Sequence, residues 1–582
     1  MKFGVLALDY DGTIARDGVL DRDVKAAIGE ARSGGILVVL VTGRILSDLK
    51  RVTGGIDFVD AVVAENGAVI ALPNGHTSVF GNAPPQALLD DLHRRDIQFA
   101  TGDCVVEADA DSAPQILSSI RLLELPFAIL FNRSRLMILP QAISKGTGLR
   151  EVLNMFRISP HNAIAIGDAE NDHELLAACE VGVAVGWGSV ALQDRADQIL
   201  PGDGPRAVAG YIRDVTRSAR LPHDRTGRHH IDVGKTEDGA LVSLAIDGRN
   251  ALIVGDPHSG KSAANGLACE QMILQGYCVC VIDPEGDYGT LESLPGVVVF
   301  GGDDPPPDLP HVERALRHFD LSVVIDLSHE SYPAKVKYLG ALLPMLASIR
   351  RTTGLPHRIV VDEAHYFLHE PNVRELLDFE LGAYTVITYR PSDLHPDLRQ
   401  GIQGIVAKRL TLQREVEALL TIAKCGQSKQ WLATLATLAD DEAVLLPGSA
   451  EAAGELRRFK LLPRMTPHVR HKTKYFDVQL PEAEGFWFSD CGKMLRPPAR
   501  SLQQFVQLLA AEPMTCLDGH VRRGDFSQWI AGVFHDHRLA SEVRKVEQRY
   551  RLDHLQDVRQ PITTLIEGRY GFSEDEALRT KA

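Results

Sequence analysis

The sequence predicts an α/β protein with two parallel sheets in succession, followed by a smaller, mainly helical module. Residues 1–215 alternate short β-rich runs with helical patterns, and residues 230–465 repeat this alternation. Such alternation is typical of strand–helix–strand units around a parallel sheet. In the second block the Val/Ile runs are nearly continuous, which indicates strands covered on both faces. Residues 470–582 show mainly helical patterns.

Length, charge and composition narrow the class of protein before any motif is considered. The chain of 582 residues is long enough for two to four domains. Its net charge of −15 argues against nonspecific binding to nucleic acid, without excluding a local basic patch. Because we find neither a secretion signal nor an apolar run that could span a bilayer, we expect a cytoplasmic protein with no membrane partner.

The first block contains the signals of a doubly wound sheet in chain order. Four runs are predicted to be strands: "KFGVLALDY", "GILVVLVTGR", "AVVAENGAVIAL" and "NAIAIGD". Helical patterns occupy residues 21–33, 145–157 and 171–178. Residues 216–229 are polar and basic without periodicity, so we expect them to form a linker to the second block.

Two carboxylates stand where the first strand ends. Asp9 and Asp11 follow an apolar run and precede Gly12 and Thr13. Ligands of an open α/β sheet bind at the carboxyl ends of its strands, so chemistry is expected at this point. One carboxylate of such a pair can attack phosphorus while the other gives and takes a proton. Mg²⁺ would relieve their repulsion of an anionic substrate.

Further polar residues follow other strands of the first block. Thr42 comes after "VVLV", where its hydroxyl and backbone N–H could hold phosphate oxygens. Lys145 opens a predicted helix and offers a positive charge to a phosphate. Asp168 and Asp172 lie in a strand-to-helix turn and could complete a metal site, with Asn171 orienting a ligand.

These elements, in this order, resemble the haloacid dehalogenase superfamily of phosphatases, and "AENGAVI" and "KGTGL" resemble its Cof-type IIB branch. The resemblance implies a Rossmann-like sheet and a small α/β cap at about residues 82–140 that selects the substrate. It implies Asp9 as nucleophile and Asp11 as general acid and base. Phosphate holders are implied at Thr42 and Lys145. The implied Mg²⁺ ligands are Asp9, Asp11 through its carbonyl, Asp168 and Asp172.

The second block opens with a glycine-rich loop, "GDPHSGKS", which fits the pattern G-x-x-x-x-G-K-[ST]. An apolar strand precedes this loop and a helical pattern follows it, so backbone N–H groups and the helix N-terminus could cradle phosphates. Lys261 would reach the β- and γ-phosphates of ATP, and Ser262 would reach Mg²⁺. The predicted nucleotide-binding residues of the loop are Gly255, Asp256, Pro257, His258, Ser259, Gly260, Lys261 and Ser262.

An acidic pair ends a later strand of this block, in "HRIVVDEAH". Asp362 would hold the Mg²⁺ shell, and Glu363 would polarise the attacking water. With "IDPEGDY" and "VITYRPSDL", the block resembles RecA-like P-loop ATPases of the HerA/FtsK type, which implies ATP hydrolysis and a homo-oligomer. Tyr389 departs from the pattern, because relatives usually carry Gln there as a polar sensor. The basic pair Lys408 and Arg409 is interpreted as a solvated strand edge, with an arginine finger as the alternative.

The last block adds a mainly helical accessory module. Trp529 lies on an apolar helical face and is predicted to be core, whereas His520 and Asp525 could form a site but favour a structural role. His229 and His230, in and beside the linker, are interpreted as surface residues. Among the cysteines, alternation places Cys278 and Cys280 on one strand face, which favours buried core residues over a metal or redox role.

We therefore expect a Mg²⁺-dependent phosphomonoesterase, acting on sugar phosphates or other small phosphorylated metabolites and fused to an ATP-binding unit. An oligomeric nucleic-acid motor that carries an accessory phosphatase is the alternative. A third possibility is a nucleotide-sensing scaffold in which ATP is barely hydrolysed, and Tyr389 favours it.

Overall fold

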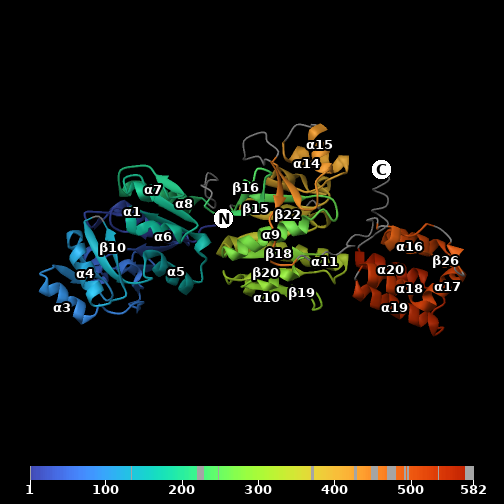
Figure 1. The fold of residues 1–582 in the computed structure, drawn as a ribbon, viewed down its shortest axis with the longest axis horizontal. Helices are drawn as coiled ribbons and strands as arrows, with labels where there is room; N and C mark the ends of the chain where they lie inside the picture. The colour runs from blue at the N-terminus through green and yellow to red at the C-terminus, as the bar shows by residue number, and fades with distance from the viewer. Residues whose placement is uncertain are drawn as a thin grey trace.

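The computed structural model shows three groups of elements that follow one another along the longest axis of the molecule (Figure 1). It describes residues 2–132, 134–218, 228–246, 248–368, 373–424, 429–446, 457–467, 480, 482–490, 493–494, 497–534 and 536–570. Most of the expected linker at 216–229 and parts of the last block therefore lie outside the described residues. The helix that precedes the linker extends to Arg217, two residues into the range expected to be irregular.

The first group is built on an eight-stranded sheet in the order β14-β13-β12-β1-β4-β5-β6-β7. The strands from β14 to β5 pair in parallel, and β6 and β7 add antiparallel pairs at one edge. Their bounds are β1 Val5–Asp9, β4 Leu37–Val41, β5 Ala61–Ala64, β6 Val69–Ala71, β7 Thr77–Val79, β12 Ala163–Gly167, β13 Val181–Val185 and β14 Gln198–Leu200. A small hairpin precedes the first helix, formed by β2 Ala15–Arg16 and β3 Val19–Leu20.

Helices cover both faces of this sheet, because its central strands are apolar along almost their whole length, with Asp9 at the end of β1 as a polar exception. In β1, Leu6 and Leu8 pack into the cluster that contains α1 and α8, whereas Val5 and Ala7 pack on the other face with α5 and α6. This burial on both faces is the reason that β1 and β12 form continuous apolar runs. The helices are α1 Arg22–Ser33, α2 Leu46–Thr53, α5 Lys145–Phe156, α6 His173–Ala177, α7 Val190–Gln193 and α8 Pro205–Arg217.

A second, antiparallel sheet is inserted between β7 and α5, where the sequence implied a cap. Its strand order is β10-β11-β9-β8, and two helices close a separate small core with it. The elements are α3 Gln86–Arg94, β8 Phe99–Thr101, β9 Val106–Asp109, α4 Ala113–Leu122, β10 Phe127–Asn132 and β11 Arg135–Pro140.

The central group is built on an eleven-stranded sheet in the order β16-β15-β25-β24-β23-β17-β22-β21-β18-β20-β19. The seven strands from β23 to β19 are parallel, and four antiparallel strands extend the other edge. The parallel strands are β17 Asn250–Val254, β18 Val279–Asp283, β19 Val297–Gly301, β20 Ser322–Asp326, β21 Arg358–Val361, β22 Tyr384–Thr388 and β23 Ile402–Ala407. The antiparallel strands are β15 His230–Lys235, β16 Leu241–Ala245, β24 Glu442–Leu446 and β25 Arg457–Leu461.

Alternation along β18 explains how the central sheet is covered. Val279 and Val281 face the cluster that includes α9, while Cys278, Cys280 and Ile282 face the cluster that includes α10, α11 and α14. Both cysteines are buried on one face, as alternation predicted. The helices of this group are α9 Lys261–Leu274, α10 Leu309–Leu316, α11 Tyr332–Thr353, α12 Val373–Leu376, α13 Pro396–Gln400, α14 Gln413–Ile422 and α15 Lys429–Ala436.

The last group packs helices around an aromatic core. Trp529 lies in this core with Phe486, Phe505 and Phe526, which confirms its predicted burial. Residues 525–534, which include Trp529, form α18 followed by one π-helical turn. The elements are β26 Ser489–Asp490, β27 Lys493–Met494, α16 Leu502–Ala511, α17 Met514–Arg523, α18 Asp525–Trp529, α19 His537–Arg551 and α20 Arg559–Tyr570.

His520 forms hydrogen bonds with two other segments of this last group. Its Nδ1 lies 2.7 Å from Asp525 Oδ2, and its Nε2 accepts a hydrogen bond from the backbone N–H of Ser489. Both ring nitrogens are therefore engaged within the module, which agrees with the structural role that the sequence favoured.

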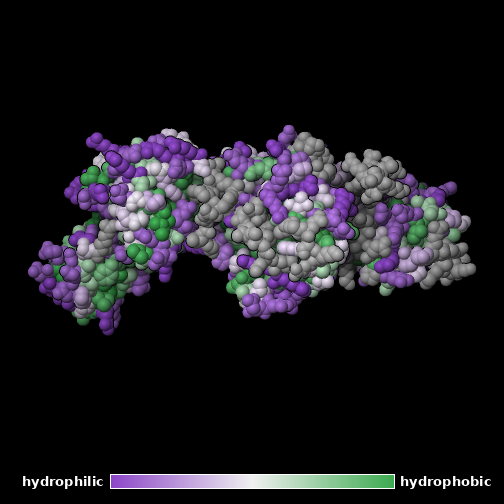
Figure 2. Space-filling model, turned by 90° about the horizontal axis from the view of Figure 1, so that it is seen from above, coloured by the Kyte–Doolittle hydropathy of each residue, from purple (hydrophilic) through white to green (hydrophobic). Residues whose placement is uncertain are grey.

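Within the described part of the chain, no helix combines the length and apolarity that a bilayer crossing requires. The face of the molecule in Figure 2 is mainly hydrophilic, with hydrophobic residues in small patches.

Candidate functional site

Three carboxylates meet at the carboxyl ends of two neighbouring strands. Asp9 is the last residue of β1, while Asp168 and Asp172 lie in the turn that follows β12. All three are buried, and one oxygen from each lies within 4.8 Å of the others. The sequence predicted this meeting because parallel strands that pair side by side end at the same edge of the sheet.

Lys145 lies between two of these carboxylates. Its Nζ donates to Asp9 Oδ1 and to Asp172 Oδ1, at 2.6 Å each. The lysine is held there because it begins α5, whose N-terminus is fixed by a capping box between Ser144 and Thr147. In this structure Lys145 therefore neutralises the acidic cluster directly.

Burial and charge act in opposite directions on this cluster. Burial raises the pKa of Asp9 well above its usual value, the neighbouring charge of Asp172 raises it further, and Lys145 only partly offsets both. Burial by itself would lower the pKa of Lys145, but the two carboxylates reverse that effect and raise it. A buried carboxylate with these neighbours gains from a further cation.

Asp11 does not join the carboxylate cluster. Its side chain accepts hydrogen bonds from Arg44 Nε at 2.6 Å and from Arg44 Nη2 at 2.8 Å. Arg44 also donates to Asp48 at 2.7 Å, so the guanidinium is held from two sides. The sequence reasoning missed Arg44, although it lies only two residues after Thr42, which was singled out.

The other expected phosphate-site residues lie at the same edge of the sheet. Thr42 follows β4 and is buried, and its hydroxyl oxygen accepts from the backbone N–H of Arg44. Asn171 donates from Nδ2 to Asn66 Oδ1 over 3.4 Å. Thr42, Asn171 and the acidic cluster thus belong to one polar region at the carboxyl ends of β4, β1 and β12.

The inserted sheet closes over this region. A Cβ atom placed on Gly43 would lie only 3.2 Å from Sδ of Met137, a residue of β11, and 3.7 Å from Asn171 Nδ2. Between β8 and β9 of the insert, the backbone N–H groups of residues 103, 104 and 105 donate to the buried carboxylate of Glu65. The insert is therefore held beside the site by Glu65, and it places the apolar side chain of Met137 next to Gly43.

The glycine-rich loop of the central sheet runs from β17 into α9. Gly260 adopts a left-handed conformation (φ 90°), and Lys261 is the first residue of the helix. Lys261 is buried, and its Nζ donates to the backbone carbonyl of Asp256 at 3.1 Å. The other predicted loop residues lie together here: Gly255, Asp256, Pro257, His258, Ser259 and Ser262.

The acidic pair after β21 faces this loop. Burial raises the pKa of Asp362 to about 7, and the neighbouring Glu363 contributes to that rise. Burial lowers the pKa of Lys261, while the nearby Glu363 and Asp362 act against that shift. Tyr288 donates its hydroxyl to Asp362 at 2.9 Å, and the ring of Tyr389 lies 5.7 Å from Lys261 Nζ.

The interpretation of Lys408 as part of a solvated edge is wrong. Lys408 is fully buried, and its Nζ donates to the backbone carbonyls of Asp440 and Glu442. It packs against the glycine-rich loop, where a Cβ atom on Gly255 would meet it at 2.6 Å. The strand edge is covered because β24 pairs with β23, which the sequence did not reveal.

Comparison with known proteins relates the first group to hydrolases. The model of the haloacid dehalogenase-like hydrolase family matches two overlapping segments, residues 6–112 and 104–212. A phosphoglycolate phosphatase of Methanosarcina acetivorans is 25% identical over 222 residues, which is 35% of this chain and 94% of that protein. A phosphoglycolate phosphatase of Nitrosopumilus maritimus is 29% identical over 225 residues, again 35% and 94% of the two chains.

Among solved structures, a subclass IIB sugar phosphatase of the haloacid dehalogenase superfamily matches with a TM-score of 0.31 and 16% identity. That match covers 36% of this chain and 98% of the other. The family match spans the strands and turns that carry Asp9, Thr42, Lys145 and Asp168. The first group of elements is therefore a haloacid dehalogenase-like hydrolase domain.

Proposed function

We propose that this chain is a Mg²⁺-dependent phosphomonoesterase that acts through a phosphoryl group transferred to Asp9. The observation that carries the proposal is the buried set of Asp9, Asp168 and Asp172 with one lysine between them. Three carboxylates and one ammonium leave this cluster short of positive charge. Asp9 Oδ2 is buried and makes no hydrogen bond within the described residues. Oxygen donors of this kind suit Mg²⁺.

In the proposed reaction, an oxygen of Asp9 attacks the phosphorus of the substrate, and the bond from phosphorus to the leaving oxygen breaks. Arg44 holds Asp11 as a carboxylate in this structure, so Asp11 takes up a proton before the reaction; it gives this proton to that oxygen and takes one from the water that later cleaves the aspartyl-phosphate. Thr42 and Lys145 hold the phosphate oxygens. Mg²⁺ held by Asp9, Asp168, Asp172 and the Asp11 carbonyl would neutralise the charge between carboxylates and phosphate.

We propose small phosphorylated metabolites as the substrates. The relatives are named phosphoglycolate phosphatases, and a solved relative is named a subclass IIB sugar phosphatase, so phosphoglycolate and sugar phosphates are the first compounds to test. Residues 82–140 would serve as the cap of that subclass. Met137 of the insert lies close to Gly43, next to Thr42, and this close approach favours compact substrates.

A phosphate-release assay with the full-length chain tests the proposal. 2-Phosphoglycolate, sugar phosphates and nucleotides are compared with and without Mg²⁺, and with and without ATP. Asp9→Asn should abolish release, whereas Asp17→Asn, the same change on an exposed turn, should leave it intact. Equal turnover by the Asp9→Asn protein would disprove the assignment of the nucleophile.

We further propose that residues 230–465 form a RecA-like P-loop unit that binds ATP, joined to the first unit (1–215) by the linker 216–229 and followed by an accessory unit (470–582). The sheet order supports it, because β22 lies between the loop strand β17 and the acidic strand β21. Lys261, Asp362 and Glu363 also lie near one another. Lys261→Ala should abolish ATP binding, whereas Lys337→Ala on an exposed helix face should not.

Glu363 is the proposed base of ATP hydrolysis. Tyr389 occupies the position where relatives usually carry the polar sensor Gln, which favours slow ATP hydrolysis. A homo-oligomer remains a prediction. The nucleic-acid motor is the less favoured alternative, because the net charge of −15 opposes contact with a phosphate backbone. It would require ATP turnover that DNA stimulates.

A further inference from the structure

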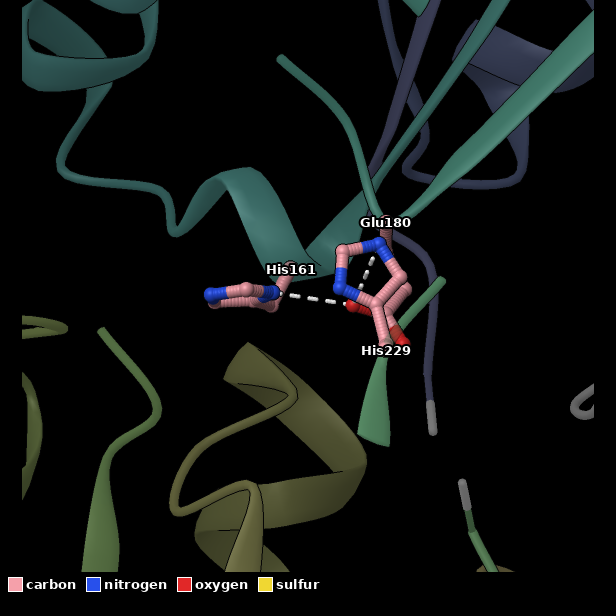
Figure 3. Close-up of side chains that lie close together, drawn as sticks. All are labelled: His161, Glu180 and His229. Carbon is pink, nitrogen blue, oxygen red and sulfur yellow. Dashed lines mark hydrogen bonds and ion pairs between the residues drawn. The ribbon is translucent and has the colours of Figure 1, made fainter. Parts of the chain in front are cut away.

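Three side chains from separate segments meet where the hydrolase domain contacts the central sheet. His161 lies in the turn Pro160–Asn162 that leads into β12, Glu180 directly precedes β13, and His229 directly precedes β15. Figure 3 shows both imidazole rings beside the Glu180 carboxylate, each joined to it by a dashed line, and one ligand atom from each of the three residues lies within 4.8 Å of the others. None of the three belongs to either phosphate site described above.

The spacing of these atoms suits a small tetrahedral ion. His161 Nδ1 lies 2.9 Å and His229 Nε2 lies 3.8 Å from Glu180 Oε2. Ligands at about 2.0–2.1 Å from a tetrahedral Zn²⁺ lie about 3.3–3.4 Å from one another. These two distances lie on either side of this value, so small side-chain shifts would bring both pairs to it, and the third pair, His161 Nδ1 and His229 Nε2, lies within 4.8 Å.

Neighbouring groups already orient two of the three side chains as they would around a metal. His161 Nε2 faces the backbone carbonyl of Gln275 at 2.9 Å, which leaves Nδ1 directed at the cluster. Tyr277 donates its hydroxyl to Glu180 Oε2 at 2.8 Å, and its ring stacks on His161 with centroids 3.7 Å apart. Metal-bound histidines and carboxylates commonly have such outer partners.

His229 is fixed by the residue before it. Arg228 donates to the backbone carbonyls of Cys179 and Glu180 and pairs with Asp197, so the chain entering β15 is fastened to the hydrolase domain. His229 Nε2 is buried and has no hydrogen-bond partner within the part of the chain that the structure describes. The side chain of His229 is 21% exposed, so the interpretation of His229 as a surface residue holds only in part, while His230, at 43% side-chain exposure, lies at the surface.

We assign only His161, Glu180 and His229 as ligands. His357 also lies near His161, but its Nδ1 accepts from the backbone N–H of Cys278 and its Nε2 faces Asn162. A cavity opens beside the cluster and is lined in part by Arg150, Ala178, Gly276 and Asp320, together with His161 and His229. This cavity gives an ion an entry path and a fourth position for water.

We propose that His161, Glu180 and His229 bind a divalent transition ion, with Zn²⁺ as the best match. Two imidazoles and one carboxylate suit Zn²⁺, whereas the oxygen-only cluster at Asp9 suits Mg²⁺. The bound ion would join β12 and β13 of the hydrolase domain to the segment that enters the central sheet. It would thus hold the two proposed enzymatic units in one relative orientation.

Zinc titration of the full-length protein tests this site. The protein is first stripped with EDTA and then titrated with Zn²⁺ in the presence of excess Mg²⁺, which occupies the oxygen-only cluster. Wild type should bind one Zn²⁺ tightly. His229→Ala should weaken that binding by at least 100-fold, and His230→Ala, the same change one residue later, should leave it unchanged.

Glu180→Gln provides a second variant that keeps hydrogen bonds to Tyr277 and His161 while removing the charge. It should also lose tight Zn²⁺ binding, with the melting temperature in EDTA close to wild type. X-ray absorption of the Zn²⁺ form should show two imidazole ligands. An ion bound only by oxygen, wild-type affinity in both His229→Ala and Glu180→Gln, or no tight Zn²⁺ in wild type would each overturn the proposal.

Discussion

Replacing Lys145 should destabilise the protein and replacing Asp9 should not, although both replacements should stop catalysis. Lys145 Nζ lies 2.6 Å from one oxygen of Asp9 and 2.6 Å from one of Asp172. At an effective dielectric constant of about 20, each attraction is about 6 kcal/mol. Lys145→Met removes both and leaves buried carboxylates uncompensated, for which the measured cost is about 3–5 kcal/mol.

Asp9→Asn has a different balance. The change loses one attraction of about 6 kcal/mol, but it relieves two repulsions between Asp9 and the other carboxylates of about 3.5 kcal/mol each at the 4.8 Å limit. It also leaves one charge fewer to bury. We therefore expect the Asp9→Asn protein to be within about 1 kcal/mol of wild type or more stable.

Hydrogen exchange measured on peptides from β1 and β4 gives the comparison without assuming that this multidomain chain unfolds in one step. In EDTA, exchange should be faster in Lys145→Met than in wild type, and Mg²⁺ should slow it again by supplying the lost charge. Asp9→Asn should exchange at the wild-type rate or more slowly. Equal destabilisation by the two variants, or a more stable Lys145→Met protein, would refute the charge balance.

Three further changes test other parts of the structure. Arg44→Gln releases the carboxylate of Asp11 and should lower kcat about 10–100-fold, with unchanged kcat disproving the positioning role. Glu65→Ala leaves three backbone N–H groups between β8 and β9 of the insert without their acceptor; it should cost about 1–3 kcal/mol and speed local hydrogen exchange there. Leu346→Ala, at a fully buried position of α11, should destabilise the central unit by about 2–5 kcal/mol, whereas Leu412→Ala, at 60% exposure, should change urea unfolding little.

The acidic site could be placed from the sequence because its residues end or directly follow continuous apolar runs. Such runs form central, parallel strands, so Asp9 and Asp168 had to end at one edge of the sheet. The contact between Arg44 and Asp11 could not be predicted in this way. It joins residues 33 positions apart through side-chain geometry, for which hydrophobic periodicity carries no signal.

The fold could also be predicted only in part: the sequence indicated the parallel strands but not the antiparallel ones. Continuous Val/Ile runs identified six of the parallel strands of the central sheet. The antiparallel edge was missed because its strands alternate or carry charge, as in Arg457–Leu461, whose sequence is RRFKL. The burial of Lys408 was missed with it, since pairing of β24 is what covers that position.

The histidine cluster shows a third limit. His229 belongs to a polar, basic stretch without periodicity, which predicted a linker. It lies near Glu180 only because the hydrolase domain packs against the central sheet. The partners His161, Glu180 and His229 come from three segments far apart in the chain, so spacing in the sequence could not reveal them.

Chemical trapping of the covalent intermediate tests the central proposal most directly. Wild-type protein is mixed with its best phosphomonoester substrate and Mg²⁺, quenched within one turnover and reduced with borohydride, which converts an aspartyl-phosphate to homoserine. Peptide mass spectrometry should find homoserine at position 9 in wild type and not in Asp9→Asn. Steady phosphate release without any reduction product at position 9 would contradict transfer of the phosphoryl group to Asp9.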